Sequence, residues 1–306
     1  TEHGYPNLQG NWTNPSQTPL QRPSGLGLQQ SYTAEQAQVL IDRALGLDDA
    51  RLAALDPDRP APPVGGRIDQ QADGNFETMP TEIARVNGEY RTSLIIDPPD
   101  GRLPYLTRIN DIYAQWRSQG FGEFDGPEMR GALERCLNPG AQLPLVSAFG
   151  GEATGNPGGD NPVRNIQIVQ NKDYVVILSE YFSLVRIIRL DSEHLEGQGL
   201  KWMGDSIAYY EGSALKIHSK NFRPEQSTGF VRSSDALEIT ETFTLISDNE
   251  MLFSYTIKDP NIFSQTFTAE IPLQRMSPDH RLYEYACHEG NYSMTSILRA
   301  ARLADN

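Results

Sequence analysis

The sequence predicts a mainly β protein built around an antiparallel, up-and-down barrel of the lipocalin-like type. The second half of the chain alternates short strand-like runs with turns, several joins such as 171–173 and 247–250 are tight enough for hairpins, and no helical stretch separates the runs. A long meander of this kind tends to close into a barrel, because closure removes its unpaired edges. The nine expected strands are 165–171, 174–180, 182–190, 206–211, 214–220, 237–247, 251–258, 265–274 and 282–287.

The first part of the chain is expected to pack against this barrel. Residues 1–28 have almost no periodicity and read as an extended strap, whereas Thr33 and Gln36 form a capping box that starts a helix over 31–46. Asn87-Gly88 predicts a tight hairpin between 81–87 and 89–96.

Three further helices are predicted by apolar residues at helical spacing. They cover 107–119, 127–137 and, at the end of the chain, 294–303. We therefore divide the chain into an N-terminal region, 1–160, and a barrel with a C-terminal helix, 161–306, which together form one compact unit.

Composition excludes several classes of protein. The 306 residues include 40 acidic and 26 basic side chains, for a formal net charge of −14, and no basic cluster offsets it. Such a chain repels nucleic acid, and its apolar runs are too short to span a bilayer. We expect neither nucleic acid nor a membrane span.

The beginning of the chain and its two cysteines bear on its compartment. The chain opens at Thr1 in turn-rich sequence, which is typical of a mature form after removal of a signal peptide, although a trimmed chain would look the same. Cys136 and Cys287 would bridge in an oxidising compartment; the alternative is two separate buried thiols. We expect a periplasmic or secreted protein.

Several stretches resemble a family of exported bacterial proteins. The distinctive ones are Arg-Thr-Ser-Leu-Ile-Ile-Asp-Pro-Pro-Asp-Gly-Arg (91–102), Glu-Arg-Cys-Leu (134–137) and Tyr-Ala-Cys-His-Glu-Gly-Asn-Tyr (285–292), with further matches at 7–12, 18–23, 167–170 and 185–188. The resemblance runs over most of the chain. It implies export and a shared fold, and it implies no particular reaction.

The chain departs from the pattern of that family at two places. Relatives carry a His shortly before the Val-Arg-Ile-Ile segment, where this chain has Tyr181-Phe182-Ser183, and they read Trp-Glu-Gly-Asp where it has Tyr210-Glu211-Gly212-Ser213. If those positions serve chemistry in relatives, this chain has lost or changed it.

Two charged residues break the apolar alternation of the predicted strands. Glu241 shares a face with Ile239 and Phe243, and Arg186 shares one with Leu184 and Ile188. A buried carboxylate needs a partner, and a guanidinium inside the barrel would supply it. An Arg186–Glu241 pair would be structural, the more common role, or would orient a polar group of a substrate.

Among the five histidines, His288 follows the last expected strand, where a side chain near a barrel mouth can act as general acid or base; the alternative is a packed, hydrogen-bonded His. Tyr285 is the accompanying tyrosine candidate. His218 lies within the strand 214–220, and His3, His194 and His280 lie in polar loop sequence and are expected to be solvated. The acidic run 191–196 is expected to be a solvated turn.

Aromatic side chains of the barrel half would line an apolar pocket. The predicted binding residues are Tyr209, Phe243, Phe253 and Tyr255, with His218 as a polar group. No metal site is predicted, because the sequence has no histidine pair at ligand spacing, CxxC or HExxH; nor does it contain a GxGxxG loop or a GxSxG elbow.

These observations favour an enzyme that needs no cofactor and acts on a hydrophobic, aromatic or terpenoid-like small molecule inside the barrel. Glu241, His288, Arg186 and Tyr285 can transfer protons, which is the chemistry of a lyase, dehydratase, isomerase or cyclase. The alternative is a binding protein for such a molecule that carries out no reaction. A barrel filled by its own side chains would favour a structural envelope protein.

Overall fold

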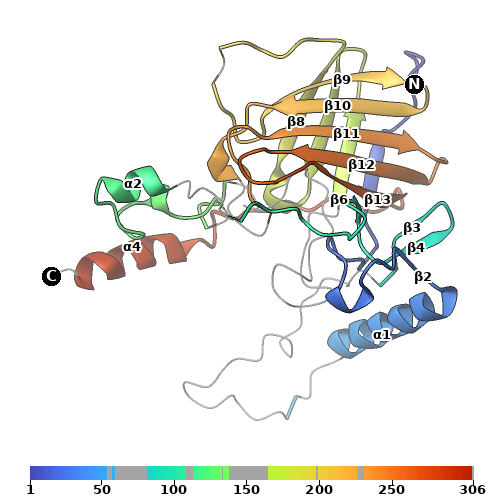
Figure 1. The fold of residues 1–306 in the computed structure, drawn as a ribbon, viewed down its shortest axis with the longest axis horizontal. Helices are drawn as coiled ribbons and strands as arrows, with labels where there is room; N and C mark the ends of the chain where they lie inside the picture. Colours follow the sequence, from blue (N-terminus) through green and yellow to red (C-terminus); the bar gives the residue numbers. More distant parts are fainter. Residues whose placement is uncertain are drawn as a thin grey trace.

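A closed, mainly β barrel forms the body of the protein (Figure 1). The structure, a computed structural model, describes residues 1–53, 57–58, 81–107, 113–132, 134–137, 165–197, 199–226 and 231–304. Within these residues the barrel strands follow the order β1-β6-β7-β8-β9-β10-β11-β12-β13, and β13 pairs back with β1. They are β1 (Gly10–Thr13), β6 (Asn165–Gln170), β7 (Tyr174–Ser179), β8 (Val185–Leu190), β9 (Asp205–Glu211), β10 (Ala214–Lys220), β11 (Glu238–Leu245), β12 (Glu250–Lys258) and β13 (Phe267–Arg275).

Eight of the predicted strands are confirmed as β6 to β13, but the strands are not all antiparallel. β8 and β9 run parallel, with Ile188 beside Ser206 and Leu190 beside Ala208. The reason is the connection 191–204, which carries the chain back along the barrel before β9 begins; parallel neighbours require a crossover of roughly this length. The expected up-and-down order is therefore wrong at this one pair.

The ninth barrel strand comes from the N-terminal strap. The predicted strand 282–287 is wrong: the segment is irregular, and Tyr283 is 77% exposed. Its place is taken by β1, which pairs with both β6 and β13 and buries Trp12 completely. The strap thus closes the barrel rather than only lying across it.

The predicted hairpin is confirmed at Asn87-Gly88, where both residues have positive φ, 53° and 84°. Its strands β3 (Arg85–Val86) and β4 (Glu89–Arg91) form a small second sheet with β2 (Ser31–Tyr32). The expected strand 89–96 forms β4 only at its beginning. Its end belongs to β5 (Ile95–Asp97), which pairs with β13. The hairpin is therefore anchored to the outside of the barrel.

Helices lie outside the barrel. The capping box at Thr33 and Gln36 starts α1 (Ala34–Leu52), which continues past Gly46, and the last predicted helix is confirmed as α4 (Tyr292–Ala304). The described part of 107–119 contains α2 (Ala114–Ser118), and residues 108–112 lie outside the described part. Single 3-10 turns complete the elements: η1 (Ser24–Leu26), η2 (Pro127–Met129), η3 (Tyr181–Ser183) and η4 (Pro224–Gln226).

The helix expected over 127–137 is wrong for the described residues. Only the turn η2 forms, because Arg130 already adopts extended backbone angles and Gly131 is a poor helix former. Residues 134–136 form turns instead, and residue 133 lies outside the described part.

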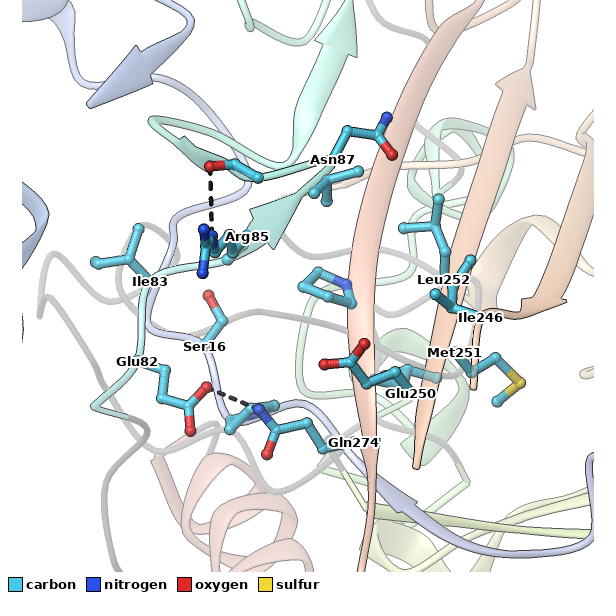
Figure 2. A pocket seen from close by; sticks show the side chains of 16 residues that line it. Ser16, Glu82, Ile83, Arg85, Asn87, Ile246, Glu250, Met251, Leu252 and Gln274 are labelled. Atoms are coloured by element: carbon cyan, nitrogen blue, oxygen red, sulfur yellow. Dashed lines mark hydrogen bonds between the residues drawn. The ribbon is translucent and has the colours of Figure 1, made fainter. Parts of the chain in front are cut away.

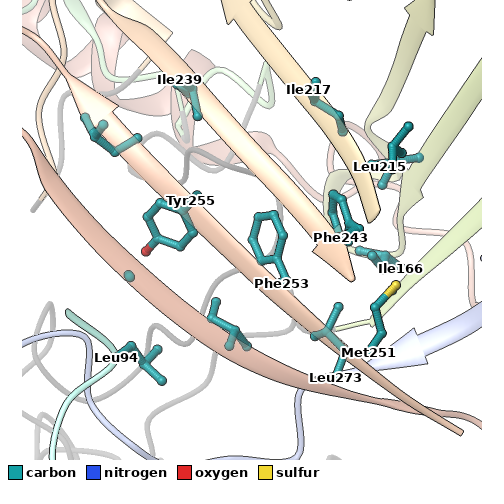
Figure 3. Close-up of a cluster of buried hydrophobic side chains, with 14 of the residues drawn as sticks. Leu94, Ile166, Leu215, Ile217, Ile239, Phe243, Met251, Phe253, Tyr255 and Leu273 are labelled. Atoms are coloured by element: carbon teal, nitrogen blue, oxygen red, sulfur yellow. The ribbon is translucent and has the colours of Figure 1, made fainter. Parts of the chain in front are cut away.

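Among the described residues, a continuous cluster of buried apolar side chains lies in the barrel interior (Figure 3). Phe243 and Phe253 are fully buried and stack with ring centroids 4.4 Å apart, and Tyr255 and Phe267 continue the aromatic row. Isoleucines such as Ile217 and Ile239 pack around them. This packing means that the predicted aromatic residues of the interior contact one another, as in an ordinary core.

Candidate functional site

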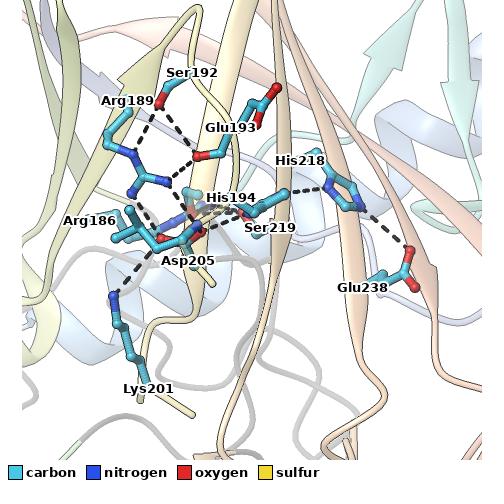
Figure 4. Close-up of polar contacts among 12 residues, drawn as sticks. Arg186, Arg189, Ser192, Glu193, His194, Lys201, Asp205, His218, Ser219 and Glu238 are labelled. Carbon is cyan, nitrogen blue, oxygen red and sulfur yellow. Dashed lines mark hydrogen bonds and ion pairs between the residues drawn. The ribbon is translucent and has the colours of Figure 1, made fainter. Parts of the chain in front are cut away.

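Two polar clusters begin at adjacent residues of β9. Because successive side chains of a strand point to opposite faces, Ser206 faces the barrel interior and Asp205 faces outward. Ser206 belongs to an inner cluster with Arg186, Ser219 and Glu241; Asp205 belongs to an outer cluster under the loop 191–197 (Figure 4).

The inner cluster is a closed ion pair. Arg186 donates through Nη1 to Glu241 Oε1 at 2.8 Å and through Nη2 to Oε2 at 2.5 Å, as the sequence predicted. Nη2 also lies 3.1 Å from Ser219 Oγ, which bonds to Ser206 Oγ at 2.7 Å. Both charged side chains are buried, at 4% and 0% exposure. The bidentate geometry compensates the two charges within the barrel.

The outer cluster is a chain of four titratable groups. Asp205 Oδ2 lies 2.8 Å from His194 Nδ1; His194 Nε2 lies 2.8 Å from His218 Nδ1; and His218 Nε2 lies 3.5 Å from a carboxylate oxygen of Glu238. The side chains become more buried from Glu238 towards Asp205. Glu238 and His218 are 41% and 37% exposed, whereas Asp205 is 2% exposed. The chain thus leads from the surface to a buried carboxylate.

Arg189 fixes the buried end. It donates to both carboxylate oxygens of Asp205, at 2.9 and 3.2 Å, and to the carbonyl of Glu193 at 2.8 Å. Burial alone would raise the pKa of Asp205, but hydrogen bonds from Arg189, His194 and the Leu195 N–H outweigh it and hold that pKa well below its ordinary value. Asp205 is therefore ionised and orients His194.

Each hydrogen bond of the chain needs one donor and one acceptor, which limits how many protons the imidazoles of His194 and His218 can hold. With Asp205 ionised, His194 donates from Nδ1 and accepts at Nε2, so His218 donates from Nδ1. One further proton fits on His218 Nε2, where it faces Glu238. A second proton would place two N–H groups against each other across 2.8 Å.

The pKa of His218 agrees with this limit. Burial, first, and the neighbouring His194, second, lower the pKa of His218 below its ordinary value, while Glu238 opposes the shift. The lowered pKa keeps His218 neutral to a lower pH than a free imidazole.

A groove of about 340 Å³ adjoins this chain on the outer face of β9, β10 and β11. In the strand register Ile207, His218 and Thr240 form one row, and Tyr209, Lys216 and Thr242 form the next. Asp191 and Ser192 also line it. Tyr209, 53% exposed, offers an aromatic face, and His218 offers an imidazole beside it. The groove is of the size that holds a small organic molecule.

The structure separates the residues that the sequence grouped together. Arg186 and Glu241 pair inside the barrel, near Phe243, Phe253 and Tyr255. Burial, and then the charge of Glu241, raise the pKa of Tyr255, which therefore stays protonated. Of the predicted binding residues, Tyr209 and His218 meet in the outer groove.

His288 and Tyr285 lie elsewhere, in the exposed segment after β13. Tyr285 stacks on Phe182 with centroids 5.0 Å apart, and His288 is exposed in a turn. Next to it, Cys136 and Cys287 form a disulfide, which resolves the two alternatives in favour of the bridge. This bridge ties the turns around residue 136 to the segment before α4.

Sequence reasoning missed His194 and Asp205. His194 was expected to be solvated, but its side chain is only 12% exposed, because Arg189 and Asp205 hold the loop against the barrel. The expectation of a solvated turn is wrong at this residue. Asp205 carries no local signal, since a carboxylate at the start of a strand is ordinary in sequence. The parallel crossover that joins the two residues is a tertiary feature.

No protein-family model matches the chain, and no curated protein does so either. The resemblance to exported bacterial proteins stays a prediction. Among the described residues, no helix is long and apolar enough to cross a membrane, and no group of three or more His, Cys, Asp or Glu side chains is placed to hold a metal ion.

Proposed function

We propose that the protein is an acid–base enzyme that transfers a proton to or from a small, hydrophobic ring compound bound in the outer groove. The observation that carries this proposal is His218, a half-exposed imidazole that lines the groove and is bonded on its inner side to the chain His194–Asp205. Lyase, dehydratase, isomerase and cyclase reactions all use such a transfer. Proton transfer is chemistry that these side chains supply themselves.

In this proposal His218 is the catalytic residue and His194 is a positioning residue. Neutral His218 accepts a proton at Nε2, and the charge that forms is stabilised through His194 by the ionised Asp205. The contact of Nε2 with Glu238 is long, at 3.5 Å, and Glu238 is half-exposed, so a substrate atom can take its place at little cost. Tyr209 and Ile207 would contact the apolar ring.

A protein that binds the same kind of molecule without reacting is the second candidate. One observation favours it: Glu238 occupies the outward nitrogen of His218. In either case, the disulfide supports a periplasmic or secreted location, because disulfides persist in oxidising compartments.

Solvent-deuterium incorporation tests the proposal and does not require an identified substrate. A small-molecule extract is incubated in D₂O with the wild type, with His218→Gln and with His288→Gln, and mass spectrometry identifies compounds that gain deuterium or are consumed. An isomerase with no net mass change is detected in the same way. His288→Gln is the matched control, because this histidine is exposed and far along the chain from the groove.

We expect a compound that gains deuterium with the wild type and His288→Gln, at a rate that falls at least a hundredfold with His218→Gln. Loss with His288→Gln alone would move the site to the turn after β13 and overturn the assignment to the groove. A compound that co-purifies with all three proteins and never exchanges would establish the binding protein.

A further inference from the structure

A second cavity, of about 450 Å³, lies between the hairpin β3–β4 and the outside of the barrel (Figure 2). One wall is the segment 82–88, and the other is formed by β12, β13 and the turn between β11 and β12. The side chains of Glu82 and Gln274 bond at 2.8 Å and join the two walls. It shares no lining residue with the outer groove.

The wall 82–88 contains backbone groups that are unpaired among the described residues. Glu82 and Ala84 use their backbone groups on the side of residues 15–18 and β4: Glu82 N–H donates to the Pro15 carbonyl, and the carbonyl of Ala84 accepts from Arg91 N–H. Because backbone groups alternate along a strand, those of Ile83 and Arg85 point to the opposite side. Within the described part of the chain, the N–H and C=O of Ile83 form no hydrogen bond, and the strand pairing leaves those of Arg85 free.

This unpaired edge is notable because Ile83 is only 6% exposed. Backbone donors and acceptors in buried segments are almost always paired. Ile83 and Arg85 are two residues apart, which is the repeat of the hydrogen bonds in a strand ladder. An extended chain added at this edge would therefore pair with both residues.

The opposite wall matches the side chains of such a strand. Ile246, Leu252 and Pro272 supply apolar surface, and Ile246 is 60% exposed. Charge is available on both walls: Arg85 lies on the hairpin and Glu250 on β12, and neither forms an ion pair among the described residues. Alternating contacts of this kind characterise peptides that extend a sheet.

We propose that this cavity binds a short peptide in extended conformation, which adds as a strand to residues 83–85. Its backbone pairs with Ile83 and Arg85, and an apolar side chain packs against Ile246, Leu252 and Pro272. A basic side chain reaches Glu250, in keeping with the net charge of −14. The site is separate from the groove and independent of the proton transfer proposed there.

Selection from a phage-displayed library of random hexapeptides tests this proposal, with three variants beside the wild type. Arg85→Pro removes one edge N–H that does not serve the ladder to β4. Ile246→Lys replaces an apolar side chain of the opposite wall by a charged one. Because Ile246 is exposed, the substitution should leave the fold intact. Val39→Lys is the matched control, since Val39 is a similarly exposed aliphatic residue, 67% exposed, on α1.

We expect the wild type and Val39→Lys to enrich the same peptides, with apolar residues at alternate positions and a basic residue. Ile246→Lys should lose this enrichment, and so should Arg85→Pro if its circular dichroism shows a folded chain. In a synthetic copy of an enriched peptide, N-methylation of the amide that faces the edge should weaken binding roughly three- to tenfold, the effect of one hydrogen bond.

Three results would overturn the proposal: no enriched sequence, equal enrichment on Ile246→Lys, or equal affinity of the N-methylated and parent peptides at every amide position. The last result would remain decisive if Arg85→Pro failed to fold, because it uses the wild-type protein.

Discussion

Two polar clusters start at the adjacent residues Ser206 and Asp205. Both bond carboxylates to basic side chains, but the two clusters serve different purposes. Inside the barrel, Arg186 and Glu241 satisfy each other and hold no free proton site. Outside, the chain from Asp205 through His194 ends at His218, whose Nε2 has only a long contact with Glu238. Burial and complete pairing make the inner cluster structural; exposure and an incomplete last contact leave the outer one free to exchange a proton.

The largest expected effect comes from breaking the inner pair. Glu241→Gln leaves the guanidinium of Arg186 buried and without its counter-charge, so we expect the free energy of unfolding to fall by about 3–5 kcal/mol. Urea denaturation monitored by circular dichroism measures the loss.

The double variant Arg186→Met, Glu241→Leu is the control, because it removes both charges and should recover most of the lost stability. A loss below about 1 kcal/mol for Glu241→Gln, by contrast, would show that the inner pair is not the structural element described here.

A smaller loss is expected at the buried end of the outer cluster. Asp205→Asn removes a carboxylate that accepts from Arg189, His194 and the Leu195 N–H, and we expect a loss of about 2 kcal/mol. Asp191→Asn, an exposed neighbour in the same loop, should change the stability by less than about 0.5 kcal/mol. Equal effects of the two substitutions in the same urea titrations would mean that Asp205 does not anchor the loop.

The smallest effect is a pH dependence that only the outer cluster should show. Burial and the neighbouring His194 lower the pKa of folded His218, so the unfolded chain binds this proton more readily. The stability provided by neutral His218 is therefore present above the unfolded histidine pKa of about 6.5 and is lost as the pH falls below it.

Because His218 is 37% exposed, solvent screening reduces the effect, and we expect the wild type to lose about 0.5–1 kcal/mol more than His218→Gln between pH 7 and pH 5. Urea midpoints of the two proteins at both pH values measure the difference. Parallel pH profiles would contradict the lowered pKa of His218.

The elements that the sequence predicted well depend on local signals. The hairpin at Asn87-Gly88, the capping box at Thr33 and the strands with alternating burial all form as expected. The pairing of Arg186 with Glu241 was also predictable, since each breaks an apolar face that must be buried. These features do not depend on the path of the chain between elements.

What the sequence left undetermined depends on topology. The parallel contact of β8 with β9 folds the loop 191–204 over the outer face and brings His194 against Asp205. No local pattern encodes that contact, so His194 read as a solvated loop residue. Similarly, the alternation in 282–287 resembled a strand, but β1 already occupies the edge of β13.

The most direct test of the account is a titration of the histidine ring signals by two-dimensional NMR between pH 4 and pH 9. We predict that the His218 ring titrates below the ordinary histidine pKa of about 6.5, because burial and the neighbouring His194 disfavour its protonated form. Titration of the His218 ring at or above pH 6.5 would contradict the partly buried chain from Asp205 to His218 and, with it, the distinction between the two clusters.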